Sequence, residues 1–176
     1  MVSGPLPENA SAYQDARCTC PSGSAGLNQG RFSCAVCEPG TQAELPNSET
    51  CAPCQYGSFA ETAGATVCQQ CPPGAAANQL GSTACQKCAL GFFAARPGSS
   101  VCDACDPGTF SELTGSNTCQ KCAVGSAAAQ AGSSKCDVCA SGTFAQEPAH
   151  SGVGSAFCQN CPVGKVIISH PPHSAD

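Results

Sequence analysis

Apolar side chains recur along this chain at a fixed distance from cysteine and not with the period of a helix. Five residues after a cysteine, large and small side chains interleave in the series Ala25, Gln42, Phe59, Ala76, Phe93, Phe110, Ala127, Phe144 and Val166. No stretch keeps the 3.6-residue apolar spacing of an amphipathic helix. The pattern predicts very short extended segments between turns and almost no helix, and we expect the residues of this series to face a column of disulfides.

The cysteines set the period. CxxC pairs begin every 17 residues from Cys34 to Cys136, and an eighth begins at Cys158 after an interval of 22. Self-similarity at a short fixed period is typical of repeat proteins, in which each small unit contacts mainly its neighbours. No residue stands out from this lattice as a catalytic residue would, so the pattern argues against an enzyme and no catalytic residue is named.

Each repeat, called a module here, runs from the second cysteine of one CxxC (its opening cysteine) to the first cysteine of the next (its closing cysteine). Two glycines recur in it. One stands three residues after the opening cysteine, and the other stands four residues before the closing cysteine, where Asn47 is the exception. Glycine is free of Cβ strain at positive φ, and Asn tolerates that conformation best among the other residues, so both places predict turns. The first series is Gly23, Gly40, Gly57, Gly74, Gly91, Gly108, Gly125, Gly142 and Gly164, and the second is Gly30, Asn47, Gly64, Gly81, Gly98, Gly115, Gly132 and Gly154.

The composition indicates covalent stabilisation. Leu, Ile, Val and Phe make up only 24 of the 176 residues, whereas 18 are cysteine, and the net charge is −5. So few core residues do not support an ordinary hydrophobic core, but cysteine at this level is typical of a disulfide scaffold. Disulfides need an oxidising compartment, so we expect an extracellular or cell-surface protein of the secretory pathway.

The glycine pattern lies inside each module, so a disulfide between its opening and closing cysteines is the favoured scheme. It predicts Cys20–Cys34, Cys37–Cys51, Cys54–Cys68, Cys71–Cys85, Cys88–Cys102, Cys105–Cys119, Cys122–Cys136 and Cys139–Cys158. An interleaved pairing, Cys34–Cys51 with Cys37–Cys54, stays open because spacing alone does not fix connectivity. Cys18 and Cys161 are left unpaired, and we expect their partners in a longer chain, upstream of Met1 and beyond Asp176.

The organisation predicted is an N-terminal extended linker at 1–17, a tandem array at 18–164 and a C-terminal tail at 165–176. The modules are 20–34, 37–51, 54–68, 71–85, 88–102, 105–119, 122–136 and 139–158, followed by a truncated one at 161–164. The linker contains no apolar stretch like that of a signal peptide, and no segment reaches the length of a membrane span. We therefore expect a piece of a longer secreted or membrane-anchored protein.

The CxxC, the glycine after it and the glycine before the closing cysteine resemble the cysteine-rich repeats of ephrin-receptor-like extracellular regions. They also resemble the small looped submodule of tumour-necrosis-factor receptor ectodomains, and the arrays of protist surface proteins look similar. The resemblance covers Cys18 to about Lys165. It implies an extracellular region that serves as a spacer or contacts a ligand, and no ligand-contact motif carries over. The uniform period favours a repetitive rod.

Zinc is the main chemical alternative. CxxC-x13-CxxC lies close to zinc-ribbon spacing, and eight pairs would build four all-cysteine sites in a reduced, intracellular protein. Such arrays usually present a basic face to nucleic acid, but this chain has only seven Lys and Arg. The same scarcity argues against phosphate binding and a nucleic-acid partner. Eight copies outside a βαβ context do not favour a thioredoxin-like thiol, and no CxxC is followed by the His of a haem attachment site.

A few single residues have a second interpretation beside the structural one. His170 and His173 in the tail are more simply a solvated linker than metal ligands. Asp103, Asp106 and Asp137 beside cysteines suit turns better than calcium binding. Asn9 begins the sequon Asn-Ala-Ser and is a candidate glycosylation site.

The sequence therefore predicts a small disulfide-rich fold, an elongated tandem-repeat rod of about eight 17-residue modules with short β segments. The expected function is a structural, disulfide-stapled region of an extracellular stalk, coat or filament, without cofactor or metal, whose partners are other protein chains of the assembly, including self-association. The alternative is a ligand-binding receptor ectodomain. Its candidate surface is the lengthened Cys139–Cys158 loop with Glu147, His150 and Phe157.

Overall fold

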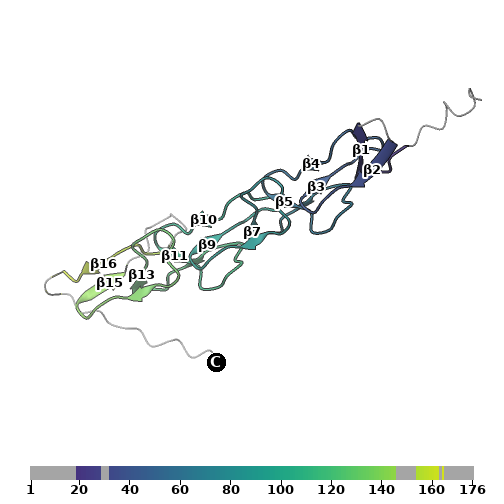
Figure 1. Cartoon of the computed structure of the whole chain (residues 1–176). Coiled ribbons are helices and arrows are strands. Elements are labelled where there is room, and N and C mark those ends of the chain that lie inside the picture. Colours follow the sequence, from purple (N-terminus) through teal and green to yellow (C-terminus); the bar gives the residue numbers. More distant parts are fainter. Residues whose placement is uncertain (1–18, 29–31, 146–153, 163, 165–176) are drawn as a thin grey trace, which may run out of the picture.

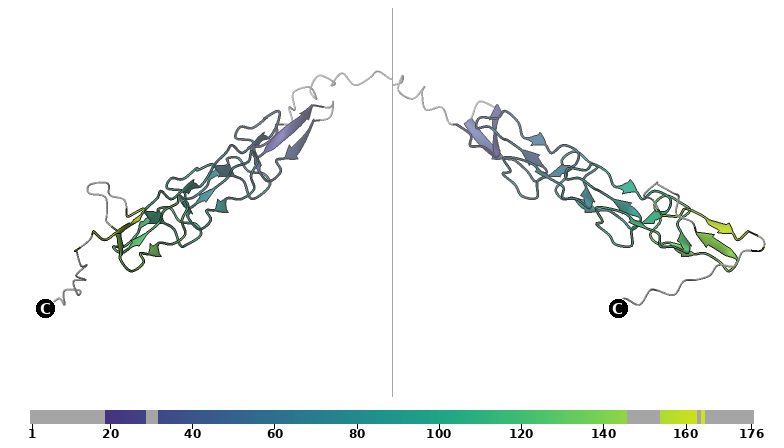
Figure 2. Two further views of the ribbon diagram at one scale, coloured as in Figure 1. Left: turned by 90° about the vertical axis from the view of Figure 1, so that its left-hand side faces the viewer. Right: turned by 180° about the vertical axis from the view of Figure 1, so that it is seen from behind.

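The computed structural model describes residues 19–28, 32–145, 154–162 and 164. These residues form a long rod in which the modules follow one another from one end to the other (Figure 1). The first strand pair lies at one end and the last pair at the opposite end (Figures 1 and 2). The described part of the chain contains only strands, turns and irregular segments, so no helix in it is able to cross a membrane.

Each module supplies the first strand of an antiparallel pair and the CxxC segment at its end supplies the second, so the rod holds eight two-stranded sheets along its described length. The first strand of a pair follows the first turn, and the second strand is formed by the CxxC segment. In the module that opens at Cys105, for example, Thr109 pairs with Lys121 and Phe110 pairs with Gln120. The strands are β1 Ser24–Asn28, β2 Phe32–Val36, β3 Thr41–Gln42, β4 Ala52–Pro53, β5 Ser58–Phe59, β6 Gln69–Gln70, β7 Ala75–Ala76, β8 Gln86–Lys87, β9 Phe92–Phe93, β10 Asp103–Ala104, β11 Thr109–Phe110, β12 Gln120–Lys121, β13 Ser126–Ala127, β14 Asp137–Val138, β15 Thr143–Ala145 and β16 Cys158–Asn160.

A small disulfide-rich fold of tandem modules, as the sequence predicts, is thereby confirmed. Strands of only two residues are too short to be stable alone. The glycine turn at one side and the disulfide at the other hold each pair together, so a conventional apolar core is not needed. The first pair, β1–β2, is longer, with five residues in each strand.

The core is a narrow column of cysteine and alanine. The opening cysteines of the middle modules are 0–2 % exposed, and the residue six positions after each of them is also buried. That residue is small in the described modules: Gly26, Ala43, Ala60, Ala77, Ala94, Ser111, Ala128 and Ala145. A larger side chain has no room in such a thin interior, because close-packed cores respond to single methylene groups.

The deepest burial thus falls one residue later than the series that the sequence suggested. Five residues after the opening cysteine, Ala25, Ala76 and Ala127 are buried, whereas Phe59, Phe93 and Phe110 stay partly exposed. A phenyl ring is too large to lie wholly inside a two-stranded module. The alternation of large and small residues therefore shapes the surface of the rod more than its interior.

The chain winds about the rod axis as it advances. In Figure 1, β4, β10 and β16 lie along one edge of the rod, while β7 and β13 lie along the opposite edge. Strands of every third module thus return to the same edge. This winding brings modules into contact that are not adjacent in sequence.

Candidate functional site

The repeated feature of the rod is a set of disulfides, one in each module. They join Cys20 to Cys34, Cys37 to Cys51, Cys54 to Cys68, Cys71 to Cys85, Cys88 to Cys102, Cys105 to Cys119, Cys122 to Cys136 and Cys139 to Cys158. These are the pairs of the sequential scheme. Their Cα–Cα distances are 5.5–5.7 Å, within the ordinary range for disulfides. Sixteen sulfur atoms in disulfides are not available as the thiolate ligands that the zinc alternative requires.

The first turn of each module is a type II turn. In the module that opens at Cys37, Gly40 has a φ of 85°, and the N–H of Thr41 donates to the carbonyl of Glu38 at 3.0 Å. The same bond recurs in modules with and without proline before the glycine. The predicted turn at this glycine is confirmed, and its cause is the positive φ that the third residue of a type II turn requires.

Consecutive modules are joined by backbone hydrogen bonds, which we call the ladder. Between the modules that open at Cys54 and Cys71, the N–H of Gly57 donates to Ala77 at 2.8 Å, and the N–H of Ala60 donates to Ser82 at 3.1 Å. In the other direction, the N–H of Gly81 donates to the carbonyl of Cys54 at 2.8 Å. Equivalent bonds recur along the rod with nearly the same lengths. The neighbouring modules are therefore held in one fixed orientation.

The first-turn glycine also touches a module two positions further on. A Cβ added at Gly57 would lie 2.0 Å from the carbonyl oxygen of Gly98, and one at Gly91 would lie 1.9 Å from that of Gly132. Distances of 2.0–2.2 Å are found at the other such glycines from Gly23 to Gly108. Contact mainly between adjacent modules, as the repeat suggested, is therefore an incomplete description. The winding of the rod adds a second layer of contacts that excludes every side chain from this place.

The second turn is more permissive. A Cβ added at Gly64 or Gly98 would first meet the side chain of Val36 or Gln70, at 3.4 Å in both cases. Asn47 occupies this place with a φ of 61°, as its left-handed tolerance predicts. Its N–H donates to the carbonyl of Cys20, as the glycines do in later modules, and its Oδ1 also accepts from the N–H of Cys20 at 2.9 Å.

That side-chain bond gives the N–H of Cys20 the acceptor that a preceding module provides for later opening cysteines. The amides of later opening cysteines, from Cys37 onward, donate to the first-turn glycine of the preceding module, as Cys37 does to Gly23 at 2.9 Å. Asn47 supplies the equivalent acceptor for Cys20. Sequence reasoning explained the conformation of Asn47 but missed this bond, because nothing local brings residues 20 and 47 together.

Serine hydroxyls close the second turns. The Oγ–H of Ser82, Ser99 and Ser116 donates to the carbonyl three residues earlier at 2.7–2.8 Å. Such local bonds are the reason that serine favours turns. Sequence reasoning missed this role, although a serine directly after the second-turn glycine is visible in several modules.

The lengthened module keeps these contacts after its extra residues. A Cβ added at Gly108 would lie 2.1 Å from the carbonyl oxygen of Gly154, in the same sense as the earlier pairs, and one added at Gly154 would lie 2.3 Å from the carbonyl oxygen of Gly108. The N–H of Ala128 donates to the carbonyl of Ser155 at 3.2 Å. Phe157, next to the closing cysteine, is 66 % exposed. Glu147 and His150 of the same candidate surface lie outside the described residues.

The other residues singled out in the sequence do not come together. Asp103, Asp106 and Asp137 are exposed, and Asp137 makes an exposed ion pair with Lys135 at 3.4 Å, which contributes little. Among the described residues, no three His, Cys, Asp or Glu side chains form a group able to hold a metal ion. Asn9, Cys18, His170 and His173 lie outside the described residues. Cys161 is half-buried and forms no disulfide with a described cysteine.

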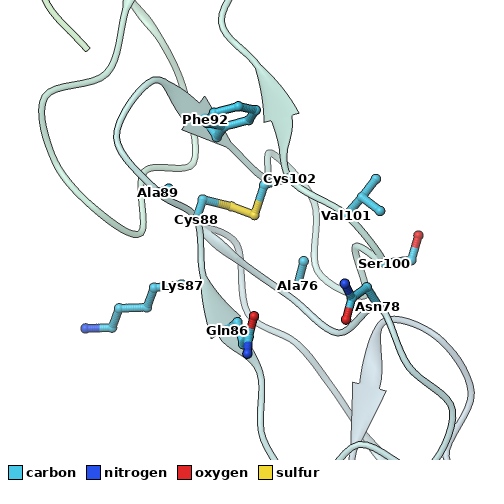
Figure 3. A pocket seen from close by; sticks show the side chains of 10 residues that line it. All are labelled: Ala76, Asn78, Gln86, Lys87, Cys88, Ala89, Phe92, Ser100, Val101 and Cys102. Carbon is cyan, nitrogen blue, oxygen red and sulfur yellow. A yellow bond between two sulfur atoms is a disulfide. The ribbon is translucent and has the colours of Figure 1, made fainter. Parts of the chain in front are cut away.

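Two shallow hollows lie beside the module that opens at Cys71. One, of about 310 Å³, is lined by Ala76, Phe92, Val101 and the Cys88–Cys102 disulfide (Figure 3). The other, of about 290 Å³, is lined by small polar residues such as Asn78 and Ser82. Ala76 stands where neighbouring modules carry Phe59 and Phe93, so the ring that borders the first hollow is that of Phe92. No buried charge faces either hollow, and neither identifies a ligand.

The fold and the ladder define the class: a disulfide-rich protein built of tandem cysteine-rich repeats. A sequence profile of the family described as tyrosine-protein kinase ephrin type A/B receptor-like matches residues 40–88 and 108–151. These two stretches cover just over half of the chain, and the chain belongs to this family. The resemblance drawn from the CxxC and glycine pattern is confirmed.

Comparison with curated proteins gave no match for this chain. The family and the disulfides together point to an extracellular or cell-surface location. The repeated contacts described above are disulfides, turns and main-chain hydrogen bonds. They hold the backbone in place and do not form a site for a ligand.

Proposed function

We propose that this region is a structural rod of an extracellular stalk, coat or filament, which holds the segments at its two ends apart. The observation that supports this proposal is the network of contacts between modules. The ladder bonds each module to the next, and the first-turn glycine touches the module after that. A chain of independent loops would bend at every CxxC. Contacts that reach two modules ahead restrict that bending.

The surface composition agrees with this role. Apart from the exposed charges and single apolar residues, the outside of the described modules is made mostly of Ala, Ser, Thr, Gly and Gln. Small side chains and a backbone held by disulfides leave few flexible sites for proteases. We propose that partners are other protein chains that pack along this surface.

Location and shape test this proposal separately. Antibodies raised against the purified chain should stain intact, unpermeabilised source cells or detect the protein in the medium. Small-angle scattering of the oxidised chain should give an elongated, rigid particle. Staining only after permeabilisation would contradict the extracellular assignment, and a compact or freely bending particle would contradict the rod.

The alternative, a ligand-binding ectodomain, has one supporting observation, the exposure of Phe157 at the end of the lengthened loop. Labelled protein should then bind intact source cells, and Phe157→Ser should abolish that binding without changing the number of disulfides. As the matched control, Val67→Ser removes another exposed apolar residue that directly precedes a closing cysteine. Equal binding by both variants and the original chain would exclude a ligand site at Phe157.

A further inference from the structure

Most of the chain length in the rod lies in loops that the disulfides close. Each disulfide joins the first and last residues of a module across a Cα–Cα distance of 5.5–5.7 Å, with a sequence separation of 14 in seven modules and 19 in the last. Between consecutive disulfides the chain consists only of a CxxC connection, such as Cys102 to Cys105. A pull on the two ends therefore travels through sulfur–sulfur bonds and CxxC segments and bypasses the loops.

The geometry of the rod places load along this path. β1–β2 and β15–β16 lie at opposite ends (Figures 1 and 2), so tension on flanking segments acts along the whole array. The ladder bonds resist first, but each net hydrogen bond contributes only about 1 kcal/mol. Once they yield, the covalent path limits further extension.

The limit follows from chain dimensions. At about 3.4 Å per extended residue, the path from Cys20 to Cys161 through intact disulfides is about 130 Å long, whereas the fully reduced segment reaches about 480 Å. Reduction of one 14-residue module releases about 42 Å, and reduction of the last module releases about 59 Å.

We propose that this array is a length-limited tether, in which disulfides keep the module loops out of the load path until a thiol reductant releases them one module at a time. The inference rests on the proposed role as an extracellular rod, because only an oxidising compartment keeps the path closed. The partner that releases length is a dithiol. Each disulfide takes two electrons and two protons from one dithiol, which becomes a cyclic disulfide, and the module is left with two thiols.

Exposure sets the order of release. Access to sulfur governs thiol–disulfide exchange, and the opening cysteines from Cys37 to Cys122 are 0–2 % exposed. In the last module, Cys139 is only partly buried and Cys158 is exposed. This disulfide is reduced first, so the longest step comes first.

Force-clamp measurement on the whole oxidised chain, held by handles at its two termini, tests the tether. Without reductant, extension of the array should stop at the covalent limit. Added dithiothreitol should then produce seven steps of about 42 Å and one of about 59 Å, with the longer step earliest in most molecules. Extension by several hundred ångströms without reductant, or steps of other sizes, would overturn the proposal.

A variant locates the release in one module. Cys105→Ser with Cys119→Ser should lengthen the unreduced array by about 42 Å and remove one short step. If this variant does not fold, the step sizes of the original chain still decide the matter. The measurement uses purified oxidised protein and so tests the load path separately from the location. Correct steps with intracellular staining would support the load path through the disulfides but overturn its use as a tether in the cell. Wrong steps with surface staining would overturn the tether and leave the proposed location in place.

Discussion

The two turns of each module need the same backbone conformation but tolerate different residues. Gly91 in a first turn and Gly98 in a second turn have φ angles of 81° and 75°. A Cβ at Gly91 would overlap the carbonyl oxygen of Gly132, whereas a Cβ at Gly98 would meet only the end of the Gln70 side chain. Conformation alone therefore asks for glycine or asparagine at both places, and packing restricts the first to glycine.

The sequence records this difference. Glycine occupies the first-turn place in every module, while the second-turn place accepts Asn47. At the second turn only the local backbone conformation limits the residue type. At the first turn the backbone of another module lies against the glycine, so the packing of the rod also limits it. Variants at the two turns separate these contributions.

The largest effect is expected at the first turn. Gly91→Ala combines left-handed strain of about 1–2 kcal/mol with a backbone overlap that has to push two modules apart, so we expect a loss of about 4 kcal/mol or more. Thermal unfolding under non-reducing conditions measures it. Gly125→Ala is the control, because its φ of 83° is alike but no described residue lies within 4 Å. Equal losses at both sites would show that the contact two modules ahead does not contribute.

Removal of one disulfide should have the next largest effect. Cys105→Ser with Cys119→Ser opens a loop of 14 residues, and loops of this size lose about 3 kcal/mol when their crosslink is removed. Denaturant unfolding gives the difference, and peptide mapping of the unreduced chain shows whether the other pairs stay sequential. A variant as stable as the original would mean that turns and ladder alone hold the module.

A smaller effect is expected in the cysteine and alanine column. Ala94 is 1 % exposed, so Ala94→Leu should overpack the module and destabilise it by about 1–3 kcal/mol. Ala95→Leu changes the adjacent, exposed residue in the same way and should leave the unfolding midpoint nearly unchanged. If Ala95→Leu were the more destabilising of the two variants, residue 95 and not residue 94 would belong to the core.

The smallest effect concerns the second turn. Asn47→Gly keeps the φ of 61° accessible but removes the bond from Cys20 N–H to Oδ1, which we expect to lower stability by about 1 kcal/mol. Asn47→Ala should lose a further 1 kcal/mol or so from left-handed strain. Amide exchange at Cys20 checks the bond directly, since protection there should fall in both variants.

Much of the fold was predictable because it is local. The spacing of cysteines and glycines predicts the modules, their turns and the absence of long strands, since each of these depends on residues close in sequence. The conformation of Asn47 belongs to the same group. The family resemblance rests on these features too.

The remaining features depend on how the chain winds. The overlap of Gly57 with Gly98 joins residues 41 positions apart, and no period in the sequence states how many modules complete a turn. The buried series from Ala43 to Ala145 was visible as a place that accepts only small residues. Apolarity alone favours the larger phenylalanines one residue earlier, whereas the thin interior admits only a small side chain.

Because the ladder is uniform, whole modules can be removed from the chain or added to it without a change in the contacts between the others. Each central module offers the same donors and acceptors to the next module and the same glycine contact to the one after it, so removal or duplication of 17 residues joins surfaces that already match. A shorter deletion between the two glycines of a central module brings them closer along the chain and shifts their contacts, whereas the longer last module keeps its contact with Gly108 through Gly154. Gene duplication and loss can therefore change the span of this region in fixed increments while its cross-section stays the same.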